Sequence, residues 1–473
     1  MKDENSDTIV AVSTPPGQGG IGIIRMSGSA SYEVAHRIFV RGGRGNKLRR
    51  RSGENFNYRP RQLYYGYIVD EAGMELDEVL ISFMPAPHTY TCEDVVEINA
   101  HGGAVPLGNI LNLILGMGVR LAEPGEFTKR AFLNGRIDLV QAESVLSIIN
   151  ARTTRGLFSS LQGLKGFLSQ EMEEMGQELL DLRAAIEVDA DFPLEDVEPA
   201  DYKGLRVRVE KLRNKALSLH RRSAQGRILQ EGLKTVIAGK PNVGKSSLYN
   251  YLLHEDRAIV TAVPGTTRDL LTDYVNLRGV PLRLMDTAGL RRDGDTVERI
   301  GMDYSRRAIE AADLLLFMVD LAGGIDREDM WIYENLPHVE RQELIIIGNK
   351  IDRELKVTPE ELEKLFPGKR LIKTSVVTGE GMADLEEAIV KTAFSGEVGG
   401  EEGALVMAAR QAALIEEIVA CLEDAVSALG KNLPLDLVAV DLQQAYEKLQ
   451  NLLGEELPAD ILDQIFSKFC IGK

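Results

Sequence analysis

The sequence is poor in cysteine and has no long apolar run. Its three cysteines, Cys92, Cys421 and Cys470, lie far apart, and no two of them form a CxxC pair. This spacing excludes a disulfide framework and gives no indication of a zinc site. No apolar stretch approaches the roughly 20 residues that a transmembrane helix requires, and the acidic start MKDENSD differs from the basic and then apolar start of a secretory signal. We therefore expect reduced thiols, no membrane span and a cytoplasmic protein.

Positive charge is also in deficit. The 473 residues include 55 Lys and Arg against 72 Asp and Glu, which gives a net charge of −17. Such a surface disfavours broad, non-specific binding to nucleic acid, although a local basic patch can still contact phosphates. One basic low-complexity stretch, VRGGRGNKLRRRSG from Val40 to Gly53, is either a solvated loop or such an RNA contact.

The length and the hydrophobic pattern predict several domains. Residues 1–124 mix short β-rich runs such as DTIVAVST and EVLISFMP with Gly and Pro turns, which is typical of a compact α/β domain. Residues 125–231 carry apolar residues at helical spacing, interrupted by DFPLEDVEP. Residues 232–394 alternate apolar strands such as KTVIAG and LLLFMVD with helical patterns, which predicts a doubly wound parallel sheet. Residues 395–473 begin with the linker-like SGEVGGEEG and return to helical periodicity, so the doubly wound domain interrupts a helical one.

The segment GKPNVGKS, from Gly239 to Ser246, has the pattern of a phosphate-binding loop between a strand and a helix. Its glycines let main-chain N–H groups point at phosphate oxygens, Lys245 brings a cation to the β- and γ-phosphates, and the Ser246 hydroxyl can ligate Mg²⁺. The predicted binding residues of this segment are Asn242, Val243, Gly244, Lys245, Ser246 and Ser247.

Three further motifs follow in the order expected of a GTP-binding domain: GTTRD, DTAG and NKID. Asp286 can hold magnesium through water, while the Gly289 N–H meets the γ-phosphate. The Asp352 carboxylate can accept two hydrogen bonds from the edge of guanine, which adenine cannot supply, so GTP is predicted rather than ATP. The predicted binding residues of the last two motifs are Asp286, Thr287, Ala288, Gly289, Asn349, Lys350 and Asp352.

The residue after DTAG is Leu290, where Ras-like hydrolases place a water-orienting glutamine. Another group must position water, and the stretch DGDTVERIG beyond it offers carboxylates. Arg268 and Arg291 are either arginine fingers or ordinary loop residues.

Over its full length the sequence resembles the MnmE (TrmE) family of tRNA modification GTPases. The resemblance rests on DTIVAVSTPPGQGGIGIIRMSG near the start, on the set PNVGKSSLYN, PGTTRD, DTAGLR and VERIG, and on the terminal FCIGK. Ribosome-assembly GTPases share the middle set but not the two terminal signatures. The resemblance implies an α/β folate-binding and dimerisation domain (1–124), a helical bundle domain (125–231 and 395–473, with a C-terminal CIGK motif) and an inserted Ras-like P-loop GTPase domain (232–394).

The resemblance also implies an activity. Family members work with a flavin-dependent partner, MnmG (GidA), and add an aminomethyl or carboxymethylaminomethyl group to carbon 5 of the wobble uridine of certain tRNAs. The implied one-carbon donor is a reduced folate, either formyl- or methylene-tetrahydrofolate. A homodimer through the N-terminal domain and a hetero-oligomer with the partner are expected.

For hydrolysis, the family implies a K⁺ ion in place of an arginine finger, which would neutralise charge in the transition state. Glu298, in VERIG, matches the glutamate that orients the attacking water. The resemblance assigns Thr267 with Ser246 to Mg²⁺, and Ser375 in TSVV to the loop behind guanine, where this sequence departs from the serine-alanine usual in the family. The implied K⁺ ligands are Asn242, Thr261, Val263 and Thr266.

For folate, the matching positions are Arg25, Glu97, Arg136 and Lys473, each of which would otherwise be an ordinary charged surface residue. Cys470 is either catalytic or close to substrate, as the family implies, or a buried structural thiol beside Phe466 and Phe469. The rival hypothesis for the whole chain is a switch, in which the GTP state only regulates binding to a ribosome or membrane.

Overall fold

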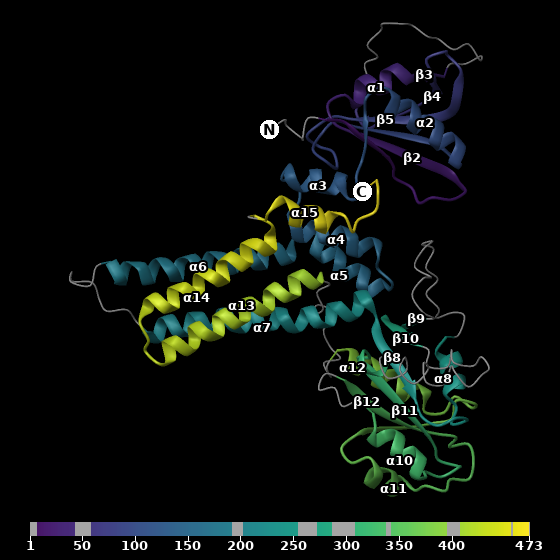
Figure 1. The fold of residues 1–473 in the computed structure, drawn as a ribbon, viewed down its shortest axis with the longest axis vertical. Coiled ribbons are helices and arrows are strands. Elements are labelled where there is room, and N and C mark those ends of the chain that lie inside the picture. The colour runs from purple at the N-terminus through teal and green to yellow at the C-terminus, as the bar shows by residue number, and fades with distance from the viewer. Residues whose placement is uncertain are drawn as a thin grey trace. The chain divides into compact units, whose positions relative to one another are not determined.

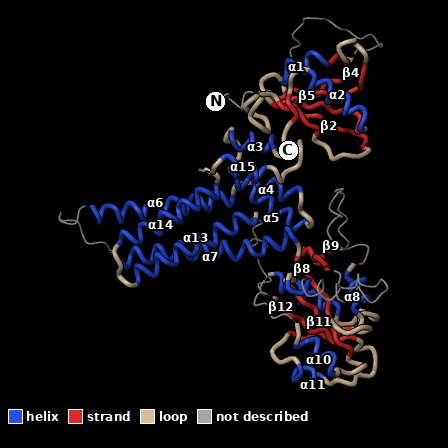
Figure 2. The backbone as a smooth tube through the Cα atoms, in the orientation of Figure 1, coloured by secondary structure: helices blue, strands red, loops and turns tan. Residues whose placement is uncertain are grey.

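The computed structural model describes residues 7–42, 58–191, 202–253, 272–285, 308–336, 342–394, 407–455 and 457–472. The chain divides into two compact units: residues 1–142 with 450–473, and residues 143–449. Figure 1 labels the elements along the chain, and Figure 2 separates helices from strands. The finer boundaries predicted at residues 124, 231 and 394 stay predictions.

The first unit contains a seven-stranded sheet of order β3-β4-β5-β6-β2-β1-β7. Neighbouring strands are antiparallel except for β1 and β7. The strands are β1 (Ile9–Val12), β2 (Gly19–Ser27), β3 (Phe39–Arg41), β4 (Leu63–Val69), β5 (Glu75–Met84), β6 (Val95–Gly102) and β7 (Arg120–Leu121). In β4, buried and more exposed residues alternate, because one face of the sheet packs on the core.

Helices α1 (Ser31–Ile38) and α2 (Ala104–Gly116) contribute their apolar residues to the core of this sheet. Helices α3 (Glu126–Leu133) and α15 (Ala459–Phe466) belong to the same unit and contact each other. The contact brings the C-terminal segment of the chain back to α3, where the buried ring of Phe466 lies 6.2 Å from the ring of Phe132.

The second unit contains a group of helices in the two regions where the sequence has apolar residues at helical spacing. They are α4 (Leu139–Ile149), which starts within the first unit, α5 (Thr154–Leu164), α6 (Phe167–Asp191), α7 (Tyr202–Glu231), α13 (Ala409–Gly430) and α14 (Leu435–Leu453). Three ion pairs join α6 to α7, from Arg208 to Glu178, Lys215 to Glu174 and Arg222 to Glu171. The α7 partners recur every seven residues and therefore share one helix face.

The rest of the second unit is a doubly wound domain with the sheet order β13-β12-β11-β8-β10-β9. Its strands are β8 (Leu233–Ala238), β9 (Thr272–Leu277), β10 (Val280–Met285), β11 (Leu314–Asp320), β12 (Glu343–Asn349) and β13 (Arg370–Thr374). All neighbours are parallel except β9 and β10, so the sheet has an antiparallel edge strand that the apolar pattern alone did not single out.

Helices cover both faces of this sheet (Figure 1). On one face, the apolar residues of α8 (Lys245–Leu252) and α12 (Met382–Ala393) join the core. On the other face lie α10 (Arg327–Glu334) and α11 (Pro359–Leu365). The central strand β11 is almost wholly buried, which explains its continuous apolar run. Among the helices within the described ranges, none has the length and apolar character of a transmembrane segment.

Candidate functional site

The phosphate loop joins β8, in the middle of the sheet, to α8. Three of its residues have positive φ: Gly239 (136°), Asn242 (64°) and Gly244 (114°). A Cβ at Gly239 would lie 2.2 Å from the Met318 carbonyl oxygen, and one at Gly244 would lie 2.3 Å from Asn349 Nδ2. Glycine is therefore required at both positions, by conformation and by close approach. The loop ends at the N-terminus of α8, where unpaired main-chain N–H groups favour an anion.

Lys245 is the first residue of α8, and its ammonium group turns back over the loop. Lys245 Nζ donates to the carbonyl oxygens of Gly239 at 2.7 Å and Lys240 at 2.6 Å. Ser246 and Ser247 are exposed on the first turn of the helix, while Val243 is buried beneath the loop. The predicted lysine and serines therefore lie together at one helix end.

Asn349, at the end of β12, connects the phosphate loop to the loop after β13. Its Nδ2 donates to the Val243 carbonyl oxygen at 2.8 Å, and its Oδ1 accepts from the Val376 N–H at 3.3 Å. The side chain is 4% exposed, so both bonds are shielded from water.

Two other residues of the NKID motif, Lys350 and Asp352, bond to residues at the ends of neighbouring strands. Lys350 Nζ lies 2.6 Å from Asp320 Oδ2, at the end of β11. Burial alone would raise the pKa of Asp320, but the bond from Lys350 and two main-chain N–H groups outweigh it, and the pKa is lowered. The Ser375 hydroxyl donates to Asp352 Oδ1 at 2.6 Å, which lowers the pKa of Asp352 and leaves an ionised acceptor at neutral pH.

A hollow of about 280 Å³ lies between the phosphate loop and the loop after β11. It is lined by Lys240, Pro241, Asn242, Val243, Asp320, Gly323, Gly324, Ile325, Asp326 and Lys350. The predicted phosphate-loop residues thus share one recess with a residue of the guanine motif.

Several predicted residues lie outside the described ranges, and their roles stay predictions. They are Thr261, Val263, Thr266, Thr267, Arg268, Asp286, Thr287, Ala288, Gly289, Leu290, Arg291, Glu298 and Lys473.

A second polar cluster lies in the first unit, on β2 and β6. Arg25 and Glu97 are directly opposite each other in the strand register, and their side chains form an ion pair of 2.8 Å. The Arg25 guanidinium also donates to the Gly472 carbonyl oxygen at 3.2 Å. Arg136 lies 4.7 Å from the centre of the Tyr90 ring, and Arg25 lies 5.8 Å from the same ring. The structure therefore places Arg25 and Arg136 over the Tyr90 ring, and Glu97 beside Arg25. Sequence analysis missed Tyr90.

Cys470 is exposed, so the alternative of a buried structural thiol is wrong. Its neighbours Phe466 and Phe469 are the buried residues of the segment. The Gly125 N–H donates to the Cys470 carbonyl oxygen at 3.3 Å. This bond fixes the main chain at Cys470, while the residue stays exposed. Gly472, which accepts from Arg25, follows two residues later.

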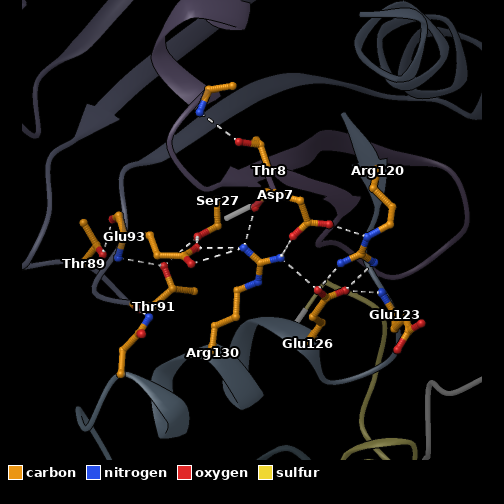
Figure 3. A network of polar contacts seen from close by, with 12 residues as sticks. Asp7, Thr8, Ser27, Thr89, Thr91, Glu93, Arg120, Glu123, Glu126 and Arg130 are labelled. Atoms are coloured by element: carbon orange, nitrogen blue, oxygen red, sulfur yellow. Dashed lines mark hydrogen bonds and ion pairs between the residues drawn. The ribbon is translucent and has the colours of Figure 1, made fainter. Parts of the chain in front are cut away.

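A buried arginine supports the segment that carries Tyr90 (Figure 3). Arg130, 3% exposed, pairs with Asp7 at 2.6 Å, Glu126 at 3.0 Å and Glu93 at 3.2 Å. Glu93 also accepts from the Ser27 hydroxyl at 2.6 Å. The i,i+4 spacing of Glu126 and Arg130 was the only sequence signal for this network.

Comparison with known proteins identifies the family. The family model described as MnmE helical domain matches residues 139–470, and that described as GTP-binding protein TrmE N-terminus matches residues 8–136. The tRNA modification GTPase MnmE of Geobacillus kaustophilus is 44% identical over 469 residues, which cover 99% of each chain. The tRNA modification GTPase MnmE of Acetivibrio thermocellus is 45% identical, and the match covers 99% of each chain. That of Bacillus subtilis is 42% identical, and the match covers 99% of this chain and 100% of the relative.

These matches confirm the predicted fold class, with an N-terminal α/β domain, a helical region and a P-loop GTPase domain. The matches to the relatives cover 99% of this chain and are therefore not confined to the GTPase motifs. The chain therefore belongs to the MnmE family of tRNA modification GTPases.

Proposed function

We propose that this chain is a potassium-stimulated GTPase that acts with a flavin-dependent MnmG-type partner on tRNA. The joint activity adds an aminomethyl or carboxymethylaminomethyl group to carbon 5 of the wobble uridine. The observation that carries the GTPase part is the link made by Asn349, which holds the phosphate loop and the guanine-side loop in one site.

Residues of the described nucleotide site have the chemistry that GTP binding needs. The loop N–H groups and Lys245 bind the β- and γ-phosphates, and Asp352 accepts from the guanine edge. The exposed Ser246 hydroxyl and the exposed Asn242 side chain supply oxygen ligands of the kind that hard cations take. In the proposal, Ser246 and Thr267 hold Mg²⁺, while Asn242, Thr261, Val263 and Thr266 hold K⁺. Both cations supply positive charge to the phosphates when bound.

Water activation is assigned to Glu298, which would orient the attacking water in place of the glutamine that Leu290 replaces.

The Arg25 cluster fits a reduced folate. Glu97 can accept from the N–H edge of a pterin, and Arg25 and Arg136 can meet carboxylates of the folate tail. The Tyr90 ring, with a guanidinium 4.7 Å from its centre, offers an aromatic face to a flat heterocycle. Lys473 would add a further cation, and Cys470 would lie near the bound one-carbon unit.

The remaining parts of the proposal concern organisation. We assign folate binding and homodimerisation to residues 1–124, the helical bundle to 125–231 and 395–473, and the GTPase to 232–394. The cytoplasm is the proposed location, because both tRNA and reduced folates occur there.

Nucleoside mass spectrometry of tRNA from a deletion strain tests the proposal. We expect the modified wobble uridine to disappear and to return when the wild-type chain is supplied. Normal modification in the deletion strain would leave only the switch hypothesis. Hydrolysis rates of the purified chain in K⁺ and in Na⁺ test the cation separately, and equal rates would remove the potassium part alone.

A further inference from the structure

The side chain of Lys240, the second residue of the phosphate loop, points away from the loop into two carboxylates. Lys240 Nζ lies 2.7 Å from Asp326 Oδ2 and 2.9 Å from Asp329 Oδ2. Both acids come from the start of α10, across the hollow that the loop borders. Lys240 is therefore a tether between the phosphate loop and a different element of the domain.

The two acids are already bonded to each other's main chain. Asp326 is the N-cap of α10 and accepts from the N–H groups of Glu328 and Asp329, while Asp329 Oδ2 accepts from the Asp326 N–H at 3.1 Å. This reciprocal capping box places two negative charges side by side. The Lys240 ammonium lies where it compensates both.

Asp329 depends on this lysine more than Asp326 does. The Asp329 side chain is 1% exposed, whereas that of Asp326 is 60% exposed and can be hydrated. Asp329 Oδ1 has no hydrogen-bond partner among the described residues. A carboxylate buried in this way is costly unless a cation neutralises it, so the pair fixes Lys240 in place.

The position of Lys240 matters to the phosphate end of the site. Its carbonyl oxygen accepts the 2.6 Å bond from Lys245 Nζ, the ammonium predicted to contact the β- and γ-phosphates. At Gly239 the loop runs so close to the Met318 backbone that a Cβ would clash with its carbonyl oxygen, and Asn349 holds the loop at Val243. The Lys240 side chain supplies the anchor between these two points, beside the strained Asn242.

We propose that Asp329, acting through Lys240, is a positioning residue of the GTPase site. It fixes the first half of the phosphate loop and, through the Lys240 carbonyl, the ammonium of Lys245. The inference rests on the proposed GTPase function and deepens it, because it identifies residues of α10 that position the phosphate loop.

The test compares GDP with GMP, since GMP lacks the β-phosphate that the loop grips. Kd values for both are measured on the full chain with Asp329→Asn, Lys240→Met and the double variant. We expect the GDP affinity to fall about tenfold in each single variant and the GMP affinity to change less than about twofold. The double variant should resemble the single ones, because both remove the same link. Glu328→Gln, an exposed acid of the same helical turn, is the matched control and should leave both affinities unchanged.

Other outcomes overturn the inference. Equal losses for GDP and GMP would show a general structural role, and so would additive losses in the double variant. If Asp329→Asn does not yield folded protein, Lys240→Arg and Lys240→Met carry the test: Arg should retain GDP affinity and Met should lose it. A wild-type chain that binds no guanine nucleotide would instead refute the proposed GTPase function itself.

Discussion

The side-chain amide of Asn349 donates a 2.8 Å hydrogen bond to the carbonyl oxygen of Val243, 106 residues earlier in the chain. On its other side the same amide accepts from the Val376 N–H at 3.3 Å. One buried side chain thereby sets the spacing between the loop predicted to bind phosphate and the loop predicted to lie behind guanine. A nucleotide that spans both ends therefore senses this residue, even if it never touches it.

Asn349→Ala should lower the affinity for both GDP and GTP by about tenfold to a hundredfold, because it leaves the Val243 carbonyl buried without a donor. Calorimetric titration with each nucleotide measures the loss. Asn276→Ala removes a cap of the exposed β9–β10 turn, where Asn276 accepts from the Gly279 N–H, and should bind normally. Wild-type affinity in Asn349→Ala would show that the bond does not organise the site.

Asp352→Asn should change the base that is bound. Guanine presents two donors, at N1 and the 2-amino group, whereas xanthine presents N1–H and a 2-oxo acceptor. The asparagine amide matches xanthine, so GTP affinity should fall by about a hundredfold or more while XTP affinity rises. Competition between GTP and XTP for a fluorescent nucleotide measures the ratio. An unchanged preference for GTP would place base recognition elsewhere.

The conformation of the phosphate loop was predictable because its motif is local. The segment GKPNVGKS contains its own glycines, lysine and serine, and each lies where the pattern requires, at one strand end and one helix start. The residues that sequence reasoning missed act over long distances. Asp329 is recognisable only when Lys240 is seen beside it, and a single sequence does not reveal that pairing.

The cluster of Arg25, Glu97 and Arg136, for which folate binding is proposed, shows the same division. Arg25 and Glu97 were assigned from family resemblance, but their contact depends on the register of β2 against β6. A shift of one residue would place the two side chains on opposite faces of the sheet. Tyr90 was missed because nothing local distinguishes it from other aromatic residues in loops.

Glu298→Ala should abolish turnover while leaving GTP affinity nearly intact. A group that only orients the attacking water contributes to the transition state and not to ground-state binding. We expect kcat to fall about a hundredfold or more. Single-turnover hydrolysis in K⁺, together with equilibrium binding of a non-hydrolysable analogue, separates the two quantities. Turnover close to wild type would remove Glu298 from the mechanism.

Glu97→Gln should weaken tetrahydrofolate binding by about tenfold, because a neutral amide replaces the ionised acceptor of a charge-assisted bond. The substitution also loosens Arg25, whose guanidinium pairs with Glu97 at 2.8 Å. Fluorescence titration with 5-formyl-tetrahydrofolate gives the Kd. Glu75→Gln, an exposed glutamate on β5, is the control, and an equal loss in both variants would argue against a specific folate role for Glu97.

The Arg130 network should make the first unit sensitive to acid (Figure 3). Burial alone would raise the pKa values of Asp7 and Glu126, but hydrogen bonds from Arg120 and Arg130 outweigh it, and both pKa values are lowered. A carboxyl whose folded pKa is lowered contributes stability above its unfolded pKa, near 4, and loses it as the pH falls through the folded value. The network is therefore fully stabilising at neutral pH and progressively less so below about pH 4.

Removing Arg130 separates this contribution from general acid unfolding. Arg130→Met leaves Glu126 and Glu93 without their buried cation and should cost about 3 kcal/mol at pH 7, seen as a lowered Tm. Near pH 3.5, below the unfolded pKa near 4 of Asp7 and Glu126, these two carboxyls contribute less to stability through the arginine, so the Tm of the variant should approach that of the wild type. Arg37→Met, which breaks an exposed pair with Glu33 in the same unit, should change Tm little at either pH. If the gap between Arg130→Met and the wild type were the same at both pH values, the arginine would be acting through packing and not through charge.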